Sequence, residues 1–510
     1  MFLKHRTIPF FVFCTGAAVL IIEVLAIRIL APYYGNTIIT VSSVITVVLF
    51  ALSFGYYVGG ALADKHPHVK LFFSIIVVSG ISIILMHASA ITFLPTVGYK
   101  LSLIYGPLLF SLFLFFVPSF LLGLLSPFAI KLQKLQLPDI DVGRVSGQIF
   151  FWSTLGSIVG SLSAGFILIP HFGINTIVFG TGVFLIVIGM AALLRHKVSP
   201  LFICVGAAIL FFGVAHYTQS SVTLPIPYKG AVVYSADSSY QKITVLDGEY
   251  KGRPARFLIQ DRNLSAAQYR DSADPGDLAF NYTKYYALYT TVNPQPEHAL
   301  MIGGGAYSVP LALLATVPNV NIDVAEIDPF IYDVGKSYFH VTDNPRMHNI
   351  IADGRRYLHD TATSYDFIFS DAYASYLSTP DHLTTQEFFQ LAREKLSDNG
   401  VLVANVIGSL NPKTQNFLLS EIKTFKSVFP HSYFFAVESP DFSKVQNIIF
   451  MGTKGDTPPD FNILKNNEAL SYISIKLIDI NKLDLANHPL LTDNFAPVEY
   501  LLSKELGNLQ

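Results

Sequence analysis

A run of glycines and a carboxylate lie at a regular interval in the C-terminal half of this 510-residue chain. Gly303-Gly304-Gly305 follows the apolar segment HALMI, and Glu326 ends the next apolar-rich segment, 21 residues after Gly305. A glycine turn lets a ligand approach backbone N–H groups, and a carboxylate at this distance can accept hydrogen bonds from ribose hydroxyls. The spacing therefore predicts a site for a nucleoside-containing cofactor.

Further acids follow the same rule at the ends of later apolar segments. ADGRRYL places Asp353 and Gly354 at the end of a third expected strand, where the edge of a nucleobase would bind. YDFIFSDAY places Asp371 at the end of a fourth expected strand. The carboxyl ends of parallel strands meet at one edge of an open α/β sheet, and ligands bind there. Each feature alone is compatible with turn chemistry, but four in register predict one site.

The elements that carry these residues alternate between strands and helices from about residue 297, which predicts a parallel sheet with crossover helices. Upstream, residues 228–290 alternate apolar and polar positions, as in KITVLDG and ARFLIQD, and predict a small β-region. We expect a linker and small β-domain at 218–290 and an α/β Rossmann-like domain for an adenosyl cofactor at 291–510.

Residues 1–217 have a different composition. The whole chain is 51% hydrophobic and 14% charged, far fewer charges than in soluble proteins. Apolar runs of about 20 residues are long enough to cross a bilayer, so this half is predicted to be an all-α multi-pass membrane bundle of about seven helices. The predicted spans are 8–31, 39–63, 70–94, 102–130, 148–169, 174–194 and 199–217.

Small and charged residues within these runs carry further expectations. Small residues at a spacing of four indicate close helix packing rather than a substrate path. They are Gly55, Gly59 and Gly60 in the second run, and Gly156, Gly160 and Gly165 in the fifth. Glu23 and Arg28 lie inside the first run, where charge is costly, and predict either an intramembrane polar site or a structural ion pair.

Charge and cysteine content exclude several functions. The chain up to Tyr217 carries a net charge of +7 and the remainder −9, which together give the total of −2. A domain of charge −9 is a poor candidate for nucleic-acid binding, which needs clustered positive charge. The two cysteines, Cys14 and Cys204, are too few for a disulfide framework or a zinc site, and no metal is predicted.

Five motifs, in this order and spacing, resemble the spermidine synthase (polyamine aminopropyltransferase) family: IGGGAYS, VAEIDP, ADGRRYL, YDFIFSDAY and HLTTQEFF. SSYQKITV is similar to the β-region of those enzymes, and the tail LTDNFAPVEYL continues the likeness. FGYYVGGALAD resembles the membrane-fused bacterial members. The resemblance implies a Rossmann-like domain of the S-adenosylmethionine type after the β-region. It also implies a transferase in the cell (inner) membrane that moves an aminopropyl group from decarboxylated S-adenosylmethionine to an amine such as putrescine.

The resemblance also implies roles for single residues. Cofactor-binding positions of the family match Gln241, Gly303, Gly304, Gly305, Glu326 (ribose), Asp353 and Gly354 (adenine). The family's catalytic acid, which takes the proton from the attacking amine, matches Asp371, and the amine site matches Tyr282 and Tyr373.

Two acids of the family pattern are missing. The Asp that follows the glycine turn and holds the aminopropyl ammonium is Ala306, and the second acid three residues after Asp371 is Ala374. Asp381 or Glu387 are candidates to replace the latter. A buried cation without a carboxylate is costly, so the cofactor pocket is better supported than the polyamine pocket. Two alternatives therefore stay open: methyl or other group transfer from S-adenosylmethionine itself, and a transporter or scaffold with a nucleoside-sensing domain.

Two features of the sequence give conflicting predictions for the orientation of the protein in the membrane. Lys and Arg gather at the N-terminus and in alternate loops, which predicts a cytoplasmic N-terminus. Seven spans would then put the soluble part outside, whereas its adenosyl cofactor is cytosolic. We favour a cytoplasmic soluble part on the cofactor chemistry. Expected partners are a small-molecule amine and the lipid bilayer, and a homodimer is left open.

Overall fold

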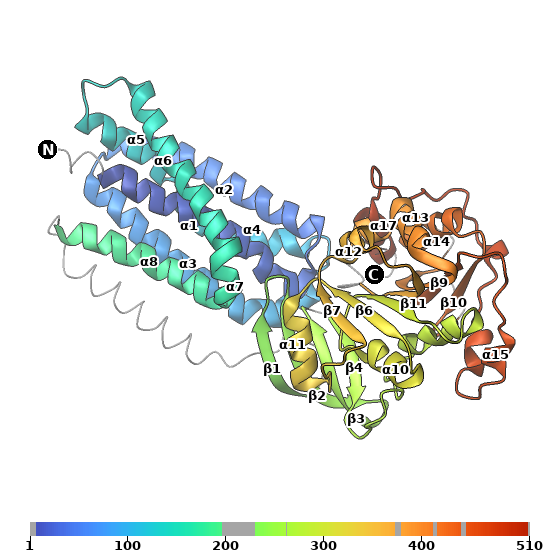
Figure 1. The fold of residues 1–510 in the computed structure, drawn as a ribbon. Coiled ribbons are helices and arrows are strands. Elements are labelled where there is room, and N and C mark those ends of the chain that lie inside the picture. The colour runs from blue at the N-terminus through green and yellow to red at the C-terminus, as the bar shows by residue number, and fades with distance from the viewer. Residues whose placement is uncertain are drawn as a thin grey trace. The chain divides into compact units, whose positions relative to one another are not determined.

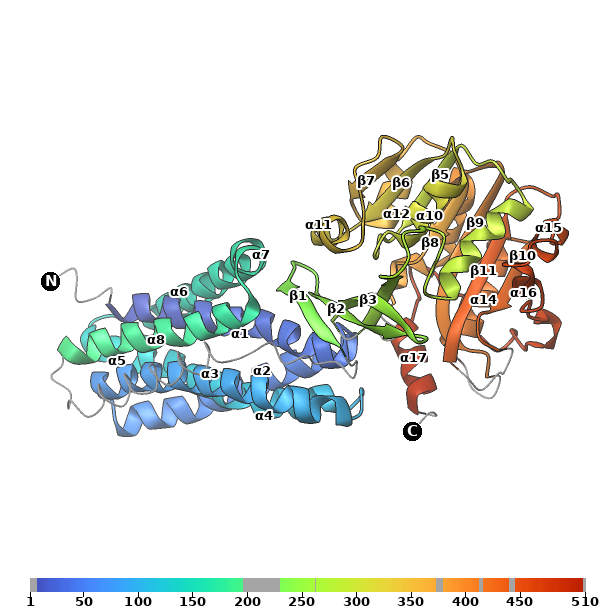
Figure 2. The same cartoon turned by 90° about the horizontal axis from the view of Figure 1, so that it is seen from below.

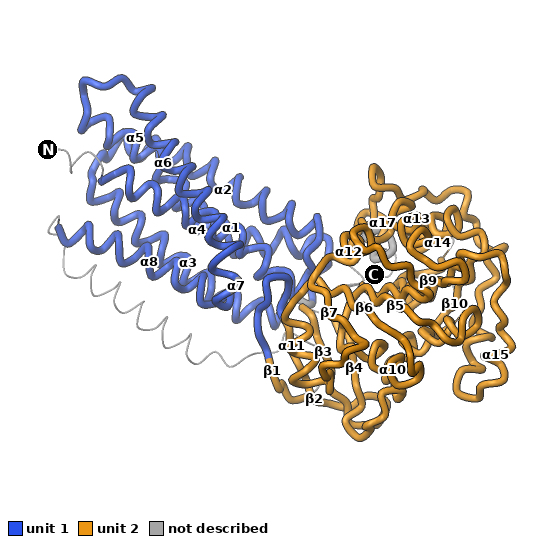
Figure 3. Tube along the Cα trace, viewed as in Figure 1, with its two compact units in different colours: residues 1–227, 235–242 blue, residues 228–234, 243–510 orange. Residues whose placement is uncertain are grey.

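The computed structural model describes residues 7–195, 230–261, 263–372, 379–411, 416–439 and 445–507. The chain forms two compact units (Figure 3). The first comprises residues 1–227 with 235–242, and the second residues 228–234 with 243–510. Each unit has its own apolar core.

The first unit is a bundle of helices (Figures 1 and 2), and within residues 7–195 six helical segments are long and apolar enough to cross a membrane. They are α1 (Thr7–Tyr34), α2 (Ile38–Lys65), α3 (Val69–Val97), α4 with α5 (Gly106–Gly123 and Leu125–Gln136), α6 with η3 (Val142–Ser163 and Ala164–Leu168) and α8 (Ile174–Arg195). Short turns η2 (Gly98–Lys100) and α7 (Ile169–His171) lie between them. The predicted multi-pass bundle is thus confirmed, and the predicted seventh run, 199–217, lies outside the described residues.

Glycines bring α1 and α6 into close contact. A Cβ atom on Gly156 would lie 2.0 Å from the carbonyl oxygen of Phe13, and one on Gly160 would lie 2.4 Å from that of Ala17. No side chain fits there, which confirms close backbone packing as the role of these glycines. The same holds for Gly55 and Gly59 against α4 and its junction with α5, whereas Gly60 is only in ordinary contact and Gly165 faces open space.

Arg28, near the C-terminal end of α1, binds a turn rather than an acid. Its guanidinium donates to the carbonyl oxygen of Ser238 over 2.7 Å and also to that of Tyr240. The side chain of Asp237 accepts the N–H of Ile174, the first residue of α8 (3.2 Å). Among the described residues Arg28 forms no ion pair with Glu23, so the ion-pair interpretation is wrong there. The segment 235–242 is instead fixed at the end of α1 that lies away from the N-terminus.

Among the described residues, the second unit contains a seven-stranded sheet and most of a four-stranded sheet. The smaller sheet, in the order β1-β2-β3-β4, comprises β1 (Ala231–Asp237), β2 (Lys242–Tyr250), β3 (Arg253–Gln260) and β4 (Asn263–Tyr269). The larger sheet, in the order β10-β11-β9-β8-β5-β6-β7, comprises β5 (His298–Ile302), β6 (Asn321–Glu326), β7 (Met347–Ile351), β8 (Tyr365–Ser370), β9 (Leu396–Ser409), β10 (Ser432–Ala436) and β11 (Val445–Thr453). β9, β8, β5, β6 and β7 run parallel, and β10 and β11 pair antiparallel.

Helices cover both faces of the larger sheet, which explains its continuous apolar strands. In β5, Ala299 and Met301 pack into one core, whereas Leu300 and Ile302 pack into the other. The covering elements are η4 (Tyr282–Thr291), α10 (Ser308–Thr316), α11 (Pro329–Tyr338), α12 (Gly354–Asp360), η5 (Asp381–Leu383), α13 (Gln386–Lys395), α14 (Phe417–Val428), α15 (Asn462–Lys465), α16 (Ser471–Ser474), η6 (Ile480–Lys482) and α17 (Val498–Gly507).

The strand order reverses at β5, which lies between β6 on one side and β8 on the other. This reversal is the topological switch point at which open α/β sheets bind their ligands. The predicted fold class, a membrane helical bundle followed by a β-region and a Rossmann-like α/β domain of the S-adenosylmethionine type, is confirmed. The sheet is mixed rather than wholly parallel, because β10 and β11 add an antiparallel pair.

Candidate active site

The glycine turn and Asp371 lie against each other at the switch point. Gly303 has a φ of +94°, and its N–H donates to the carbonyl oxygen of Ala325 in β6. A Cβ atom on Gly303 would lie 2.6 Å from the carbonyl oxygen of Asp371. Both the left-handed backbone and this close approach require glycine. The turn after β5 and the acid after β8 are therefore brought together, as the sequence predicted.

Glu326, at the end of β6, organises the same turn. Its Oε2 accepts the N–H of Gly304 over 2.8 Å, and its Oε1 accepts the N–H of Asp328 over 2.9 Å. The side chain is only 7% exposed, and burial raises the pKa of Glu326 while these backbone bonds oppose the shift. Each carboxylate oxygen keeps a further acceptor position. Glu326 can therefore hold the turn and still receive a hydroxyl donor.

Asp353 and Gly354 follow β7, and each has a structural role at the start of α12. Oδ1 of Asp353 caps α12 by accepting the N–H of Arg356 over 2.9 Å. Its Oδ2 lies 2.8 Å from Nε2 of His382, and this hydrogen bond holds the pKa of Asp353 below its usual range. A Cβ atom on Gly354 would lie 2.3 Å from Ile302. The glycine at this position is thus explained by the packing of α12 on β5.

Asp371 has the most unusual environment of the predicted acids. Asn405 of β9 donates to its Oδ1 over 2.8 Å. The hydroxyl of Tyr282, at the start of η4, donates to the carbonyl oxygen of Ser265 over 3.4 Å. Burial raises the pKa of Asp371 to about 6, and the nearby polar groups of Asn405 and Tyr282 oppose this shift. Burial, and the neighbouring charge of Asp371, raise the pKa of Tyr282 well above its ordinary value, so Tyr282 stays a donor at neutral pH. This geometry provides a partly buried carboxylate that can accept a proton.

Three residues that support the site were not predicted from the sequence. Asn405 holds Asp371, and Asn447 of β11 in turn donates to Oδ1 of Asn405 over 2.9 Å. His382 holds Asp353. The asparagine inside the apolar strand GVLVANVIG was a usable signal, since a polar residue buried in a strand needs a partner. Asn447 and His382 carried no such local signal.

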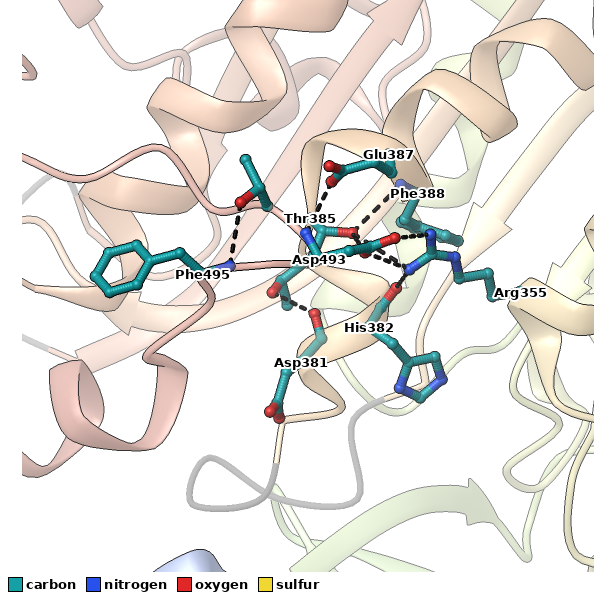
Figure 4. Close-up of polar contacts among 10 residues, drawn as sticks. Arg355, Asp381, His382, Thr385, Glu387, Phe388, Asp493 and Phe495 are labelled. Carbon is teal, nitrogen blue, oxygen red and sulfur yellow. Dashed lines mark hydrogen bonds and ion pairs between the residues drawn. The ribbon is translucent and has the colours of Figure 1, made fainter.

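The remaining residues that the sequence analysis singled out do not join the cluster around Asp371 among the described residues. Ala306, where the family has an acid, is 3% exposed and part of the apolar core. Glu387, a candidate replacement acid, accepts the N–H of Asp493 over 3.0 Å (Figure 4), and Asp381 lies exposed. Gln241 belongs to the segment of the first unit that Arg28 fixes, and its role stays a prediction. Tyr373 and Ala374 lie outside the described residues.

Comparison with known proteins identifies relatives of this chain. Residues 286–462 match the model of the spermine/spermidine synthase domain. The chain is 28% identical to the polyamine aminopropyltransferase of Vibrio vulnificus (strain CMCP6) over 296 residues, which cover 54% of this chain and 92% of that protein. It is 26% identical to the probable polyamine aminopropyl transferase of Bifidobacterium longum (strain NCC 2705) over 319 residues, 58% of this chain and 68% of that one. The spermidine synthase structure from Thermotoga maritima aligns at 21% identity with a TM-score of 0.39, over 49% of this chain and 86% of that one.

Proposed function

We propose that the soluble part of the chain, whose residues 286–462 match the spermine/spermidine synthase domain, transfers an aminopropyl group from decarboxylated S-adenosylmethionine to a small amine such as putrescine. The observation that carries this proposal is the environment of Asp371. Its pKa of about 6 leaves the carboxyl group mostly ionised at pH 7. A positioned base whose pKa is near the operating pH is suited to accept a proton from an amine during attack.

The residues around Asp371 fit an adenosyl group. The glycine turn carries no side chain that would keep a ligand from the backbone, Glu326 keeps free acceptor positions for ribose hydroxyls, and Asp353 presents an ionised acceptor for the adenine amino group. When bound, the sulfonium of this co-substrate supplies a carbon activated for displacement, with a neutral thioether as leaving group. Asp371 takes the proton that the amine nitrogen loses as its new bond to that carbon forms, and Asn405 keeps the carboxylate oriented.

One observation favours a second candidate. Ala306 offers no charge to the ammonium of an aminopropyl chain. The intact cofactor, S-adenosylmethionine, carries a carboxylate beside its ammonium at the same end, so it has less need of an acid at this position. Methyl or other group transfer from S-adenosylmethionine is therefore the alternative activity.

The test uses the full-length protein purified in detergent. With decarboxylated S-adenosylmethionine and putrescine we expect 5′-methylthioadenosine and the corresponding triamine in equal amounts. Product formed only from intact S-adenosylmethionine would establish the alternative. Binding of either form without any product would leave a nucleoside-sensing role.

We propose the cytoplasm as the compartment of the reaction, because cells keep this co-substrate there. A small amine and the surrounding lipid are the proposed partners of the two units.

A further inference from the structure

The acid proposed to bind adenine is held from a distant part of the chain. His382 lies in η5, 29 residues beyond Asp353, and the two side chains meet at 2.8 Å. Arg356 engages the other carboxylate oxygen over 2.9 Å through its backbone N–H. With one partner on each oxygen, the plane of the Asp353 carboxylate is fixed rather than free to rotate.

The turn that carries His382 is itself fixed by a charged network, which Figure 4 shows. Arg355 donates to the backbone carbonyl oxygen of His382 over 2.9 Å and grips Asp493 through two bonds of 2.7 and 2.6 Å. Thr385 donates to Asp493 over 2.7 Å. Paired bonds between a guanidinium and a carboxylate impose a defined geometry. The imidazole of His382 is therefore presented to Asp353 from a well-anchored segment.

The number of acceptor positions on Asp353 decides what it can still bind. An ionised carboxylate has about four acceptor positions on its two oxygens. The backbone N–H of Arg356 and the ring of His382 use two of them. A remaining position can accept a donor such as the exocyclic amino group of adenine. A purine with a carbonyl oxygen there would meet an acceptor and lose this bond.

We propose that His382 is a positioning residue for nucleobase recognition. It holds the carboxylate of Asp353 so that a remaining acceptor position selects a 6-aminopurine over a 6-oxopurine. The inference rests on the proposed function only in requiring that an adenosyl group binds at Asp353, and it applies to both candidate activities.

The experiment measures nucleoside binding to the full-length protein in detergent by calorimetry. The probes are 5′-methylthioadenosine and 5′-methylthioinosine. His382→Leu should weaken binding of the adenosine probe about tenfold, because a hydrogen bond to a charged group is lost. The ratio of the two dissociation constants, which measures the preference for the adenosine probe over the inosine probe, should fall by a similar factor. His382→Gln retains an N–H donor and should recover part of the preference.

The matched control is His359→Leu. His359 lies on α12, pairs with the acid Asp360 over 2.8 Å and has no contact with Asp353 among the described residues. Its loss should leave both affinities unchanged. The side chain of His382 is 49% exposed, so its variants should fold, and melting curves check this. His382→Ala replaces the leucine variant should that one not fold.

A double variant tests whether His382 acts on nucleoside binding through Asp353 or independently of it. In an Asp353→Asn background the effect of His382→Leu should largely disappear, since residues that act through each other are not additive. Additive effects, or a His382→Leu protein that prefers adenosine as strongly as the parent, would overturn the inference alone. A parent protein that binds neither nucleoside would overturn the adenosyl site as well.

Discussion

Single residues of the site show how the surroundings give two aspartates different properties. Asp371 has its pKa raised to about 6 by burial, whereas the hydrogen bond from His382 lowers the pKa of Asp353. Carboxyl groups whose pKa values are pushed apart commonly divide their tasks, one handling protons and the other remaining an ionised acceptor. We therefore expect Asp371 to take part in chemistry and Asp353 in binding.

Replacing Asp371 by Asn tests the first of these tasks. Asn keeps the shape and the acceptor for Asn405 but cannot take a proton, so turnover should fall about 10²–10⁴-fold with near-normal cofactor affinity. In the parent, turnover should rise with pH towards about 6 and level off above it, because only the ionised carboxylate acts as base. A variant that turns over at the parental rate, measured by methylthioadenosine release, would show that Asp371 is not the base.

Glu326→Gln should affect both the ribose and the turn. Both oxygens of Glu326 accept backbone N–H groups, and an amide offers only one oxygen. One N–H, that of Gly304 or Asp328, would then face another donor. Cofactor affinity should fall about tenfold or more, as expected for loss of a charge-assisted bond of about 1.5–3 kcal/mol. Equilibrium binding of methylthioadenosine measures it, and an unchanged dissociation constant would argue against a ribose role.

Among the elements, the pair α1 and α6 depends on glycine for its separation. Gly156 and Gly160 of α6 lie beneath backbone carbonyl oxygens of α1, where even a methyl group collides. Water gives no driving force inside a bilayer, so close van der Waals packing of this kind contributes much of the attraction between helices. The close packing of α1 and α6 is thus possible because glycine has no side chain at these positions.

Gly156→Ala should destabilise the bundle by about 1–3 kcal/mol, the usual cost of forcing an extra methyl group into a packed interface. Unfolding in mixed detergent, followed by circular dichroism, measures the change. Gly147→Ala is the control, because a Cβ atom at this position of α6 meets nothing within 4 Å. Alanine is also the better helix former, so the control should be neutral or slightly stabilising. Equal effects at both positions would refute the packing argument.

On the scale of the whole molecule, Arg28 bears on the topology in the membrane. It lies 21 residues along α1 from Thr7, about 30 Å at 1.5 Å per residue, which is the thickness of a bilayer core. We therefore predict that the segment 235–242, which Arg28 binds, lies at the opposite membrane face from the N-terminus. Among the described residues no candidate span follows this segment.

We accordingly predict opposite sides for the N-terminus and the C-terminus. A cytoplasmic soluble unit then requires an external N-terminus, against the distribution of Lys and Arg. Reporter proteins fused at each end, one active only in the cytoplasm and one only outside, measure this. A cytoplasmic signal at both ends would contradict the assignment drawn from Arg28. An external signal after Gln510 would contradict the cytosolic co-substrate.

The sequence by itself determined the residues that stand at strand ends. HALMI and YDFIFS are apolar at successive positions because β5 and β8 are buried on both faces, and so the chain turns where the apolar run stops. This placed the glycine turn, Glu326 and Asp371 at one edge. The same local logic gave the membrane helices, since a run of apolar residues long enough to span a bilayer needs no knowledge of its neighbours.

Tertiary structure alone decided which side chains hold those residues. Asn405 reaches Asp371 from 34 positions away, His382 reaches Asp353 from 29, and Asp493 reaches Arg355 from 138. Arg28 binds a turn 210 positions later, whereas the sequence left open an intramembrane polar site or an ion pair with Glu23. Periodicity along the chain records only which face of an element is buried. A hydrogen bond depends on where another element brings its donor, and that position is set by the packing of the whole unit.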